Sequence, residues 1–520
     1  MGRIQRPTHR VVTEAQRQFG FVREASEPQD TPESASADDH FIDDTPTIEI
    51  GDVSLEKMLV TSGMGWVIQL RRILHQLDYS LLIGRYSRRG RKAFHPRTVI
   101  GLIIYGLFRK RSALRELEDL SVLDIGAWWI CGGRRIDHST IGSFVRMHEE
   151  ALGDDFLETV TAWVVRQLKL KPGISTIDGT VVESAASRWR AIKAEAAIQE
   201  AKERQEQAEN NEKDCDLQAQ AAVAQEIAEK AEERIEMRQS YGRPTDTATV
   251  VVGDLDAVVQ PRKDGVKRPA YKVSTMMLEG QVIVGQYVHP SSEKAAVEPL
   301  LEQYERVVGG LPTRLLMDAG LHSPPILAAL CERGIDTLCP SGQAFGDDDW
   351  QRKSNGEKFS RADFRYDQQT DTYVCPAKAV LKFQGTGSSR GQSYRTYGTD
   401  QCAKCELRDK CTTDKRGRHV KRMEGAEYSD AMAAVLEQPR ARELYRRRMA
   451  LAEPVHAELR ERFGLRRFRR RGLRMVRAEF ALYCLAFNLK RVLGKAMIAA
   501  VIVHRDRLGR MYVVAIVLRA

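Results

Sequence analysis

Two acidic residues stand where carboxylates of a divalent-metal site are commonly found, at the ends of apolar strands. Asp178 lies in ISTIDGT and Asp318 in RLLMDAG, with a glycine directly after Asp178 and one residue further on after Asp318. A carboxylate that ends a buried strand before a glycine can point into a cleft that a ligand approaches closely. One Asp-Gly pair usually marks only a turn, but two such strand ends can bring ligands from separate elements to one ion.

A third acid, Glu453, lies in the segment YRRRMALAEPVHAELRERFG over residues 445–464. It is surrounded by arginines, so taken alone it is more simply explained as a salt-bridge partner than as a catalytic group. Pro454 directly after it predicts either a kink or a helix that begins near Glu453. A carboxylate on a later helix is nevertheless what the two strand-end acids would need to complete a metal site.

Four of the nine cysteines form a separate group with the spacing C-x26-C-x2-C-x5-C: Cys375, Cys402, Cys405 and Cys411. In a reducing compartment this set fits a tetrahedral structural Zn²⁺. The spacing is not the symmetric pair of C-x2-C knuckles, so zinc ligation and four unpaired thiols are equally consistent with it.

The charge of the chain is concentrated in one segment. The 520 residues carry 81 Lys+Arg against 71 Asp+Glu, a net charge of +10, and the segment from Arg440 to Arg477 alone holds 14 Arg against 4 Glu. That local excess of +10 equals the excess of the whole chain. A concentrated block of arginine indicates a polyanion such as DNA as a partner, whereas a diffuse charge would mainly affect solubility.

Composition excludes several classes of protein. With 42% hydrophobic and 29% charged residues the chain can bury a core, so wholesale disorder is not expected. No apolar run reaches the roughly 18–20 residues that a membrane span requires, and the first residues lack the apolar stretch of a signal peptide. We expect a cytoplasmic protein with reduced cysteines and no membrane partner.

The length predicts three or four domains, and changes in composition indicate their boundaries. Strand-rich sequence and turn dipeptides predict one core with an antiparallel meander, while a long stretch rich in Ala, Glu, Lys and Gln predicts a helix or helical hairpin. We expect a disordered leader (1–50), a helical DNA-binding region (52–170), the first part of a catalytic core (171–185 and 241–342), a helical insertion (186–240), an irregular insertion with the cysteine cluster (343–435), C-terminal core helices carrying Glu453 (436–495) and an atypical tail (496–520). The helical region 52–170 is equally consistent with a packing or dimerisation role.

The three acids together resemble the catalytic triad of the DDE transposases of bacterial insertion sequences, closest to the group typified by insertion sequence eleven-eighty-two. The resemblance covers about residues 60–495 and rests on HPRTVIGLIIYGLFRKRSALRELEDL, IDHSTIGSFVR, the DGT and MDAG strands and the long segment from YRRRMALAEPVHAELRERFG onward. It implies an α/β fold with an RNase H-like catalytic core, a mixed sheet flanked by helices, an all-helical N-terminal domain and a helical insertion.

The most specific part of the resemblance is the Tyr, Arg, Glu, Lys/Arg signature of that family, matched here by Tyr445, Arg448, Glu453 and Arg460. Arg460 stands where the family commonly has Lys, which keeps the charge but replaces a point charge by a planar fork. The residues that the resemblance and the charge together assign to DNA binding are Tyr445, Arg448, Arg460, Arg466, Arg467, Arg469 and Arg470.

The resemblance implies a two-metal mechanism. Asp178, Asp318 and Glu453 would hold two Mg²⁺ (or Mn²⁺) ions about 3.5–4 Å apart, one activating the nucleophile and one stabilising the leaving 3′-oxygen in an in-line phosphoryl displacement. The partners implied are transposon ends and target DNA, a second copy of the chain in a homodimer, and a nucleoid-associated location in the cytoplasm. Similar cysteines occur in the family, which favours a structural Zn²⁺.

Two other functions remain open from the sequence. One is a domesticated or decayed DNA-binding relative, which the tail VIVHRDRLGRMYVVAIVLRA, unlike the usual ending, favours slightly; the other is a nuclease of the same fold that hydrolyses DNA without joining strands. The presence of all three acids favours an active transposase. Trp189, between Arg188 and Arg190, is equally consistent with DNA contact and with packing.

Overall fold

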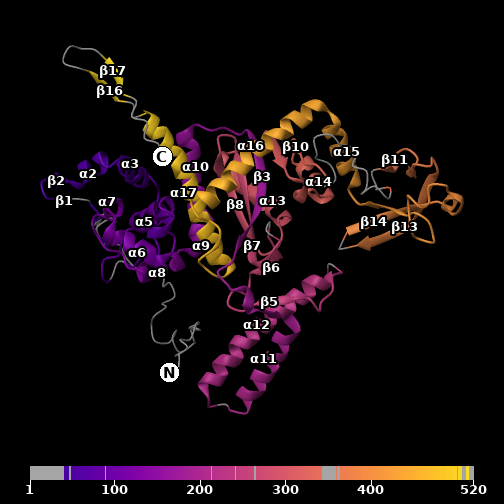
Figure 1. The fold of residues 1–520 in the computed structure, drawn as a ribbon, viewed down its shortest axis with the longest axis horizontal. Helices are drawn as coiled ribbons and strands as arrows, with labels where there is room; N and C mark the ends of the chain where they lie inside the picture. The colour runs from indigo at the N-terminus through magenta and orange to yellow at the C-terminus, as the bar shows by residue number, and fades with distance from the viewer. Residues whose placement is uncertain are drawn as a thin grey trace, which may run out of the picture.

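A mixed β-sheet lies at the centre of the molecule, and helices and three further units surround it (Figure 1). These units are an N-terminal helical region, a helical hairpin and a second sheet. The predicted α/β class is therefore confirmed. The computed structural model describes residues 40–45, 48–87, 90–211, 213–240, 242–262, 265–341, 359, 363–389, 392–499, 502–505 and 511–514.

The segment from Leu55 to Leu168 is helical, as its apolar spacing predicts. Local sequence sets several of the helix starts: Pro96 occupies the first turn of α5, and the side chain of Asp137 accepts a hydrogen bond from the Thr140 N–H at the start of α8. A short hairpin, β1 (Glu49–Ile50) and β2 (Val53–Ser54), precedes these helices. The helices are α2 (Leu55–Thr61), α3 (Gly65–Leu74), α4 (Ser80–Ile83), α5 (Pro96–Phe108), α6 (Leu114–Leu123), α7 (Ile125–Cys131), α8 (His138–Met147), α9 (Glu149–Gly153) and α10 (Asp155–Leu168).

The end of the predicted disordered leader is ordered. Residues 1–39 of that leader lie outside the described residues, but Asp44 is only 3% exposed. Its carboxylate lies 3.2 Å from both Arg71 and Arg97 and accepts a hydrogen bond from the Thr98 hydroxyl at 2.6 Å. The prediction of disorder up to residue 50 is therefore wrong for residues 40–45 and 48–50. Specific ion pairs with later helices hold the first of these segments, and β1 pairs with β2 in the second.

The central sheet is organised around β3 (Ile174–Glu183), the strand that carries Asp178. It pairs in parallel with β9 (Arg314–Met317), which in turn pairs in parallel with β10 (Thr337–Leu338). On its other edge β3 pairs antiparallel with β7 (Lys267–Leu278), and both β6 (Val258–Pro261) and β8 (Val282–His289) pair antiparallel with β7. The predicted meander is confirmed for β6, β7 and β8.

One strand of the expected meander lies elsewhere. β5 (Thr249–Val251), from the segment ATVVVGDL, pairs with the short strand β4 (Ala191–Lys193) in a separate two-stranded sheet. The prediction that this segment joins the meander is therefore wrong. Periodicity identifies a strand but not its partner, and the pair formed here closes the base of the helical insertion.

Five helices from the second half of the chain surround the sheet: α13 (Val297–Val308), α14 (Pro324–Glu332), α15 (Ala426–Glu437), α16 (Pro439–Glu461) and α17 (Leu473–Ala499). α16 contacts β3, β7 and β9, and α13 contacts β7 and β8. α17 lies between β8 and the N-terminal helices (Figure 1), where the buried side chain of Asn488 bonds both the N–H and the carbonyl of Ile283 at 2.9 and 2.8 Å. One continuous hydrophobic core joins the N-terminal helices to the sheet.

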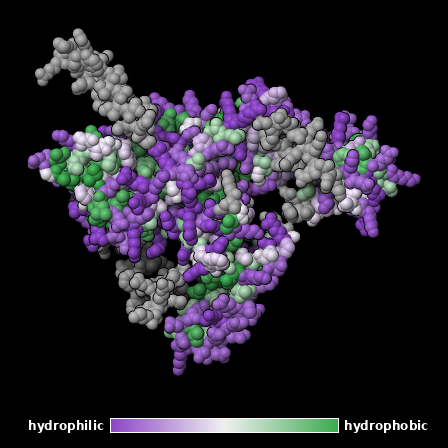
Figure 2. Space-filling model, in the orientation of Figure 1, coloured by the Kyte–Doolittle hydropathy of each residue, from purple (hydrophilic) through white to green (hydrophobic). Residues whose placement is uncertain are grey.

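The insertion after β3 is a helical hairpin, as predicted for residues 186–240. α11 (Ala194–Glu209) and α12 (Cys215–Ser240) pack against each other and extend away from the sheet (Figure 1). Alanines form most of their buried contact, among them Ala197, Ala201 and Ala231. Figure 2 shows mostly hydrophilic side chains over the outer part of this hairpin, so small side chains on one side and charged ones on the other account for its shape.

The cysteine-containing insertion forms a second sheet. Five antiparallel strands run in the order β11 (Arg365–Asp367), β12 (Thr372–Val374), β13 (Val380–Ser389), β14 (Gln392–Gly398) and β15 (Val420–Met423). The prediction of irregular structure for 343–435 is therefore wrong for the five strands and for α15. It is confirmed for residues 399–419, which contain one 3₁₀ turn and no strand, while residues 343–358 lie outside the described residues. The strands contain Gly, Ser, Thr and Arg beside a minority of apolar residues, and a small core of mainly aromatic side chains, including Tyr373 and Tyr397, holds them together.

The end of the chain contains two short strands after α17. α17 continues to Ala499, and β16 (Ile502–Arg505) pairs antiparallel with β17 (Met511–Val514). The rest of the predicted atypical tail from residue 500 onward lies outside the described residues. No helix in the described part of the chain is both long and apolar enough to span a membrane.

Candidate active site

Two of the predicted acids lie side by side on two adjacent inner strands of the central sheet. Ile177 of β3 is paired in parallel with Met317 of β9, so Asp178 and Asp318 follow at the same level of adjacent strands. Asp318 also caps the turn after β9, where its carboxylate accepts a hydrogen bond from the Leu321 N–H at 3.2 Å. The side chain of Asp178 is 16% exposed. The structure therefore brings the two predicted carboxylates together. The prediction that each acid ends a strand holds for Asp318, which follows β9, but is wrong for Asp178, because β3 continues to Glu183 with β7 as its partner.

The glycines after these acids leave room for a third carboxylate, Glu293. A Cβ at Gly179 would lie 3.1 Å from the Glu293 Cγ, and a Cβ at Gly320 would lie 3.2 Å from the Asp318 Oδ1 and 3.4 Å from the Glu293 Oε2. Glu293 is held by Lys272 at 2.9 Å. The sequence gives no signal for Glu293, because an acid just before a helix is common wherever helices begin.

Helix α16 covers the acids with side chains from the predicted signature. The Tyr445 hydroxyl donates to the carbonyl of Met317 at 3.1 Å, and the Arg448 Nη1 lies 3.6 Å from the Asp178 Oδ1. A residue that the sequence did not single out, His456, lies with its Nε2 3.4 Å from the Asp178 Oδ2. His456 follows Glu453 by three residues, and this spacing alone does not distinguish a site residue from any other residue of a helix.

α16 passes through Pro454 without ending. It runs from Pro439 to Glu461, so the prediction of a helix that begins near Glu453 is wrong. A proline within a helix removes one backbone hydrogen bond. The buried side chains Ala452, Val455 and Leu459 hold the helix against the sheet around this position, and this packing offsets the lost bond.

Glu453 lies on the exposed flank of α16 and is not in contact with the aspartates. Two arginines of α16, one before and one after Glu453 in the helix, contact β3. Arg448 lies at Asp178, and the Nη2 of Arg460 lies 3.3 Å from the Thr180 hydroxyl. Arg460 is two turns from Glu453 and therefore on the same flank. Within the described residues, no three His, Cys, Asp or Glu side chains converge closely enough to share a metal ion.

The acid pair is electrostatically strained. Burial raises the pKa of Asp178 to about 6; the Arg448 guanidinium opposes this rise, and the carboxylates of Asp318 and Glu293 add to it. Two neighbouring carboxylates that repel each other in a partly buried site are stabilised by a cation between or beside them. Oxygen donors of this kind are the ligands that Mg²⁺ prefers, so the donor set fits a hard divalent cation.

The arginines after α16 divide between the fold and the surface. Arg467 donates to the carbonyls of Ser184, Ala185 and Ala186 at 2.9, 2.7 and 3.1 Å. Arg470 lies 3.9 Å from the buried Glu479.

Arg466 pairs at 2.6 Å with Glu461, and both side chains are largely exposed. Arg469 is exposed as well. Of these four residues, Arg466, Arg467 and Arg469 are exposed, and Arg467 and Arg470 also bind partners elsewhere in the fold.

The four cysteines Cys375, Cys402, Cys405 and Cys411 line one small cavity of about 20 Å³ beside the second sheet. All four are partly buried and form no disulfide. Burial raises the pKa of the Cys411 thiol. The four predicted cysteines thus line one cavity, but within the described residues their thiols are not close enough together to share a metal ion.

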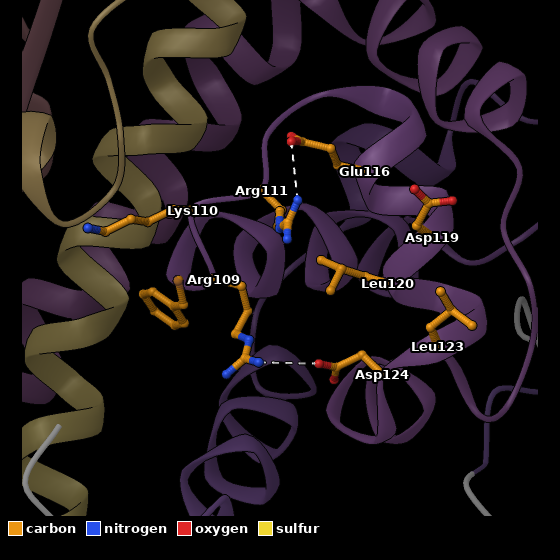
Figure 3. A pocket seen from close by; sticks show the side chains of 9 residues that line it. Arg109, Lys110, Arg111, Glu116, Asp119, Leu120, Leu123 and Asp124 are labelled. Atoms are coloured by element: carbon orange, nitrogen blue, oxygen red, sulfur yellow. Dashed lines mark ion pairs between the residues drawn. The ribbon is translucent and has the colours of Figure 1, made fainter.

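A larger cavity, of about 620 Å³, opens between α5 and α6. Its wall contains two ion pairs, Arg109 with Asp124 and Arg111 with Glu116, each at 3.6 Å (Figure 3). Lys110 extends from the same turn toward the C-terminal helices (Figure 3). None of the predicted site residues lines this cavity, so the candidate chemistry remains with the acids of the central sheet.

Comparison with known families bears on this geometry. Residues 374–493 match a family described as a transposase DDE domain, and residues 66–147 match a family described as a transposase domain (DUF772). The first match includes α16 with Glu453, and the second spans helices from α3 to α8. A comparison with curated proteins finds no match.

A mixed α/β chain with a DDE transposase domain points to an enzyme of the DNA-transposing kind, a class that generally uses a divalent metal and has DNA as its partner. The two matches in one chain together support an insertion-sequence transposase.

Proposed function

We propose that the chain is a transposase of the insertion sequence eleven-eighty-two group, which binds the inverted-repeat ends of its own element and cuts and joins DNA with Mg²⁺ or Mn²⁺. The observation that carries this proposal is the pair Asp178 and Asp318 on adjacent parallel strands beneath the helix that bears Glu453. The strand order is β10-β9-β3-β7-β6, with β8 also paired to β7, and β7 runs opposite to β3, β6 and β8. This arrangement supports an RNase H-like core.

Asp178, Asp318 and Glu453 would hold the metal ions. When bound, such ions supply Lewis acidity to the scissile phosphate and to the attacking oxygen. Asp178 and Asp318 are fixed by their strands, whereas Glu453 comes from the exposed flank of α16. The first two carboxylates therefore form a preformed part of the site, and Glu453 supplies the third from the side that DNA approaches.

The arginines of α16 bind and orient the phosphate. Arg448 lies beside Asp178 and Arg460 beside Thr180, so one guanidinium stands on each side of Glu453 along the helix. A guanidinium offers paired donors that match two oxygens of a phosphate, which places the group as well as attracting it. Tyr445 fixes the register of the helix on the sheet through the carbonyl of Met317.

His456 and Thr275 hold Asp178 from within the protein. The His456 Nε2 lies 3.4 Å from the Asp178 carboxylate and 3.5 Å from the Thr275 hydroxyl, and Thr275 is the cross-strand partner of Asp178. These contacts restrict the rotamer of Asp178 so that its carboxylate stays at the strand edge. Positioning of this kind is what precise phosphoryl transfer requires from residues that do not touch the substrate.

The proposal is tested with the purified chain, Mg²⁺ and DNA fragments that carry the ends of the element. Asp178→Asn and Glu453→Gln should each lower cutting at least about 100-fold while DNA affinity stays near that of the wild type, because they remove a metal ligand and leave the basic surface intact. Asp336→Asn, an exposed acid paired with Arg314 at the same sheet, is the matched control and should cut normally. Cutting by Asp178→Asn at the wild-type rate would contradict the proposal.

The products of the same assay separate the related functions. Joined strands indicate a transposase, cut but never joined strands indicate a nuclease, and binding without cutting by the wild type indicates a decayed or domesticated DNA-binding protein. We also propose a homodimer that holds two DNA ends, which the mass of the protein–DNA complex in solution tests; a complex with one chain per pair of ends would contradict it.

We further propose that Cys375, Cys402, Cys405 and Cys411 bind one structural Zn²⁺. Four sulfur donors around one small cavity are the donor set of a closed zinc site. Metal analysis of the purified chain should find one zinc per chain, and Cys402→Ser should lose it and lower the thermal stability. A zinc content far below one per chain would contradict this assignment.

A further inference from the structure

An exposed tryptophan follows the strand that carries Asp178. Trp189 lies in the short 3₁₀ turn Arg188–Arg190, and its side chain is 80% exposed. The Arg188 guanidinium carbon lies 4.3 Å from the centroid of the indole ring. Tryptophan usually contributes a large buried area to a core or an interface, so packing within this chain does not explain its position.

The turn that presents Trp189 is firmly held. Arg467 binds the three carbonyls directly before it, those of Ser184, Ala185 and Ala186. Directly after the ring, the carbonyl of Arg190 accepts a hydrogen bond from the Val252 N–H at 2.9 Å, and the β4–β5 pair continues from there. The ring therefore stands on a fixed backbone, which lowers the entropy lost when a ligand binds to it.

The surroundings of the ring are cationic. Arg188, Arg190 and Arg471 are exposed, and none of them has an acidic partner among the residues that the structure describes. The side chains of Arg190 and Arg471 come together above Gly253. A Cβ placed at Gly253 would lie 3.6 Å from the Arg190 Nη1 and 3.7 Å from the Arg471 Nη1. Gly253 has φ +94°, a conformation that favours glycine.

The acids nearest to this surface already have partners. Glu183, the last residue of β3, forms ion pairs with Arg262 and Arg268. Asp254 accepts hydrogen bonds from the Tyr271 hydroxyl at 2.5 Å and from the Gly472 N–H at 3.0 Å. Positive charge around Trp189 is therefore left to attract an external anion.

We propose that Trp189, Arg188, Arg190 and Arg471 form a binding site for single-stranded DNA. An unpaired base stacks on the face of the indole that Arg188 does not cover, and the phosphates on either side of that base contact Arg190 and Arg471. Stacking on an aromatic ring combined with a cationic groove is the usual way in which proteins hold unpaired strands. The inference rests on the proposed function only in taking DNA as the partner.

The position of this site gives it a separate role from the acids. Glu183 lies five residues beyond Asp178 on β3, about 17 Å along the strand at 3.3 Å per residue, and Trp189 lies further on. The site thus follows the end of the strand that carries Asp178 and has a different role from that of holding the scissile phosphate. It suits a segment of strand that has been displaced from the duplex near the cutting site.

Binding without cutting tests this inference directly. The full chain is mixed in EDTA with a fluorescent thymidine oligonucleotide of about 20 nucleotides or with a duplex of the same length, and the affinity is measured by anisotropy. Trp189→Ala should weaken binding to the single strand about tenfold and to the duplex less than about twofold, while Trp189→Phe keeps most of the single-strand affinity. Leu123→Ala, which removes another side chain of similar exposure, is the control and should change neither.

The contribution of the arginines is tested separately through the salt dependence of binding. Arg190→Ala combined with Arg471→Ala should lower the slope of log affinity against log salt on the single strand by about 1.4, at about 0.7 for each lost phosphate contact. Equal weakening of single-strand and duplex binding by Trp189→Ala, or no weakening of either, overturns the proposal. This assay measures no cutting, so its result does not depend on the proposed transposase activity. If Trp189→Ala binds single strands as the wild type does and a separate assay shows normal cutting, this inference fails while the proposed function stands.

Discussion

Asp178→Asn should stabilise the metal-free protein at alkaline pH at the same time as it removes DNA cutting. Burial raises the pKa of Asp178 from 3.8 to about 6, although Arg448 opposes the rise. At about 1.4 kcal/mol per unit, this rise corresponds to about 3 kcal/mol of free energy that the ionised carboxylate costs the fold. Asparagine has nearly the same shape and no charge, so the variant should unfold with a free energy higher by about that amount at pH 8.

The destabilisation caused by the Asp178 carboxylate changes with pH between pH 6 and pH 4. A raised pKa means that the folded protein binds a proton between pH 6 and pH 4 when the unfolded chain does not. The cost is therefore complete above pH 6, falls as the pH drops from 6 to 4, and is absent below pH 4. The advantage of Asp178→Asn over the wild type should follow the same course, large at pH 8 and absent at pH 4.

Urea unfolding in EDTA at several pH values measures this difference. Asp336→Asn is the control, because the side chain of Asp336 is 50% exposed and its ion pair with Arg314 should contribute less than about 1 kcal/mol. Addition of Mg²⁺ should stabilise the wild type more than Asp178→Asn, since the folded wild type binds the ion better. The reasoning is refuted if Asp178→Asn is no more stable than the wild type at pH 8, or if the same gain persists at pH 4.

Two further predictions concern buried groups outside the site. Burial would raise the pKa of Asp44, but hydrogen bonds from groups including Arg97 lower it to about 2. Asp44→Asn should therefore lower the unfolding free energy by about 2 kcal/mol at neutral pH, and it should remove the part of the stability that the wild type loses as the pH falls from 4 to 2. Urea unfolding at pH 7 and pH 3 checks this. Burial lowers the pKa of His148 to about 4, and neither ring nitrogen has a hydrogen-bond partner among the described residues. The unfolding free energy of the wild type should therefore fall by about 3 kcal/mol as the pH drops from 6.5 to 4, because the unfolded chain binds the proton first. His148→Phe should flatten that profile in the same assay, and an unchanged slope would contradict the assignment.

The sequence predicts the acid pair well because the signal is local. An apolar run that ends in Asp is visible in ISTID and in RLLMD, and the geometry follows once those runs pair in parallel. Glu293 illustrates the opposite case. It reaches the pair because two glycines leave room for its side chain, a relation among three separate segments that spacing along the chain does not contain.

Other elements were hidden from the sequence for different physical reasons. The second sheet consists of strands with few apolar residues, so alternation of hydrophobic and polar side chains is weak in a segment such as VLKFQGTGSS. His456 was missed because a histidine three residues after Glu453 is unremarkable until the helix is placed on β3. In both cases the missing information is the identity of the packing partner.

The arginine block also shows why a count of charges is a poor measure of a DNA-binding surface. Arg467 donates from its Nε and Nη2 to the three carbonyls before Trp189, and Arg470 lies against the buried Glu479, so both side chains also hold the fold together. The positive charge of Arg467 still contributes to the field at the surface, because no carboxylate among the described residues forms an ion pair with it. An alanine at Arg467 should therefore weaken DNA binding mainly by releasing the turn that presents Trp189, and this loss should be larger on a single strand than on a duplex. If the proposed function is correct, the charge of this segment should act on DNA in two ways, directly through Arg448 and Arg460 at the acids and indirectly through the backbone that Arg467 holds.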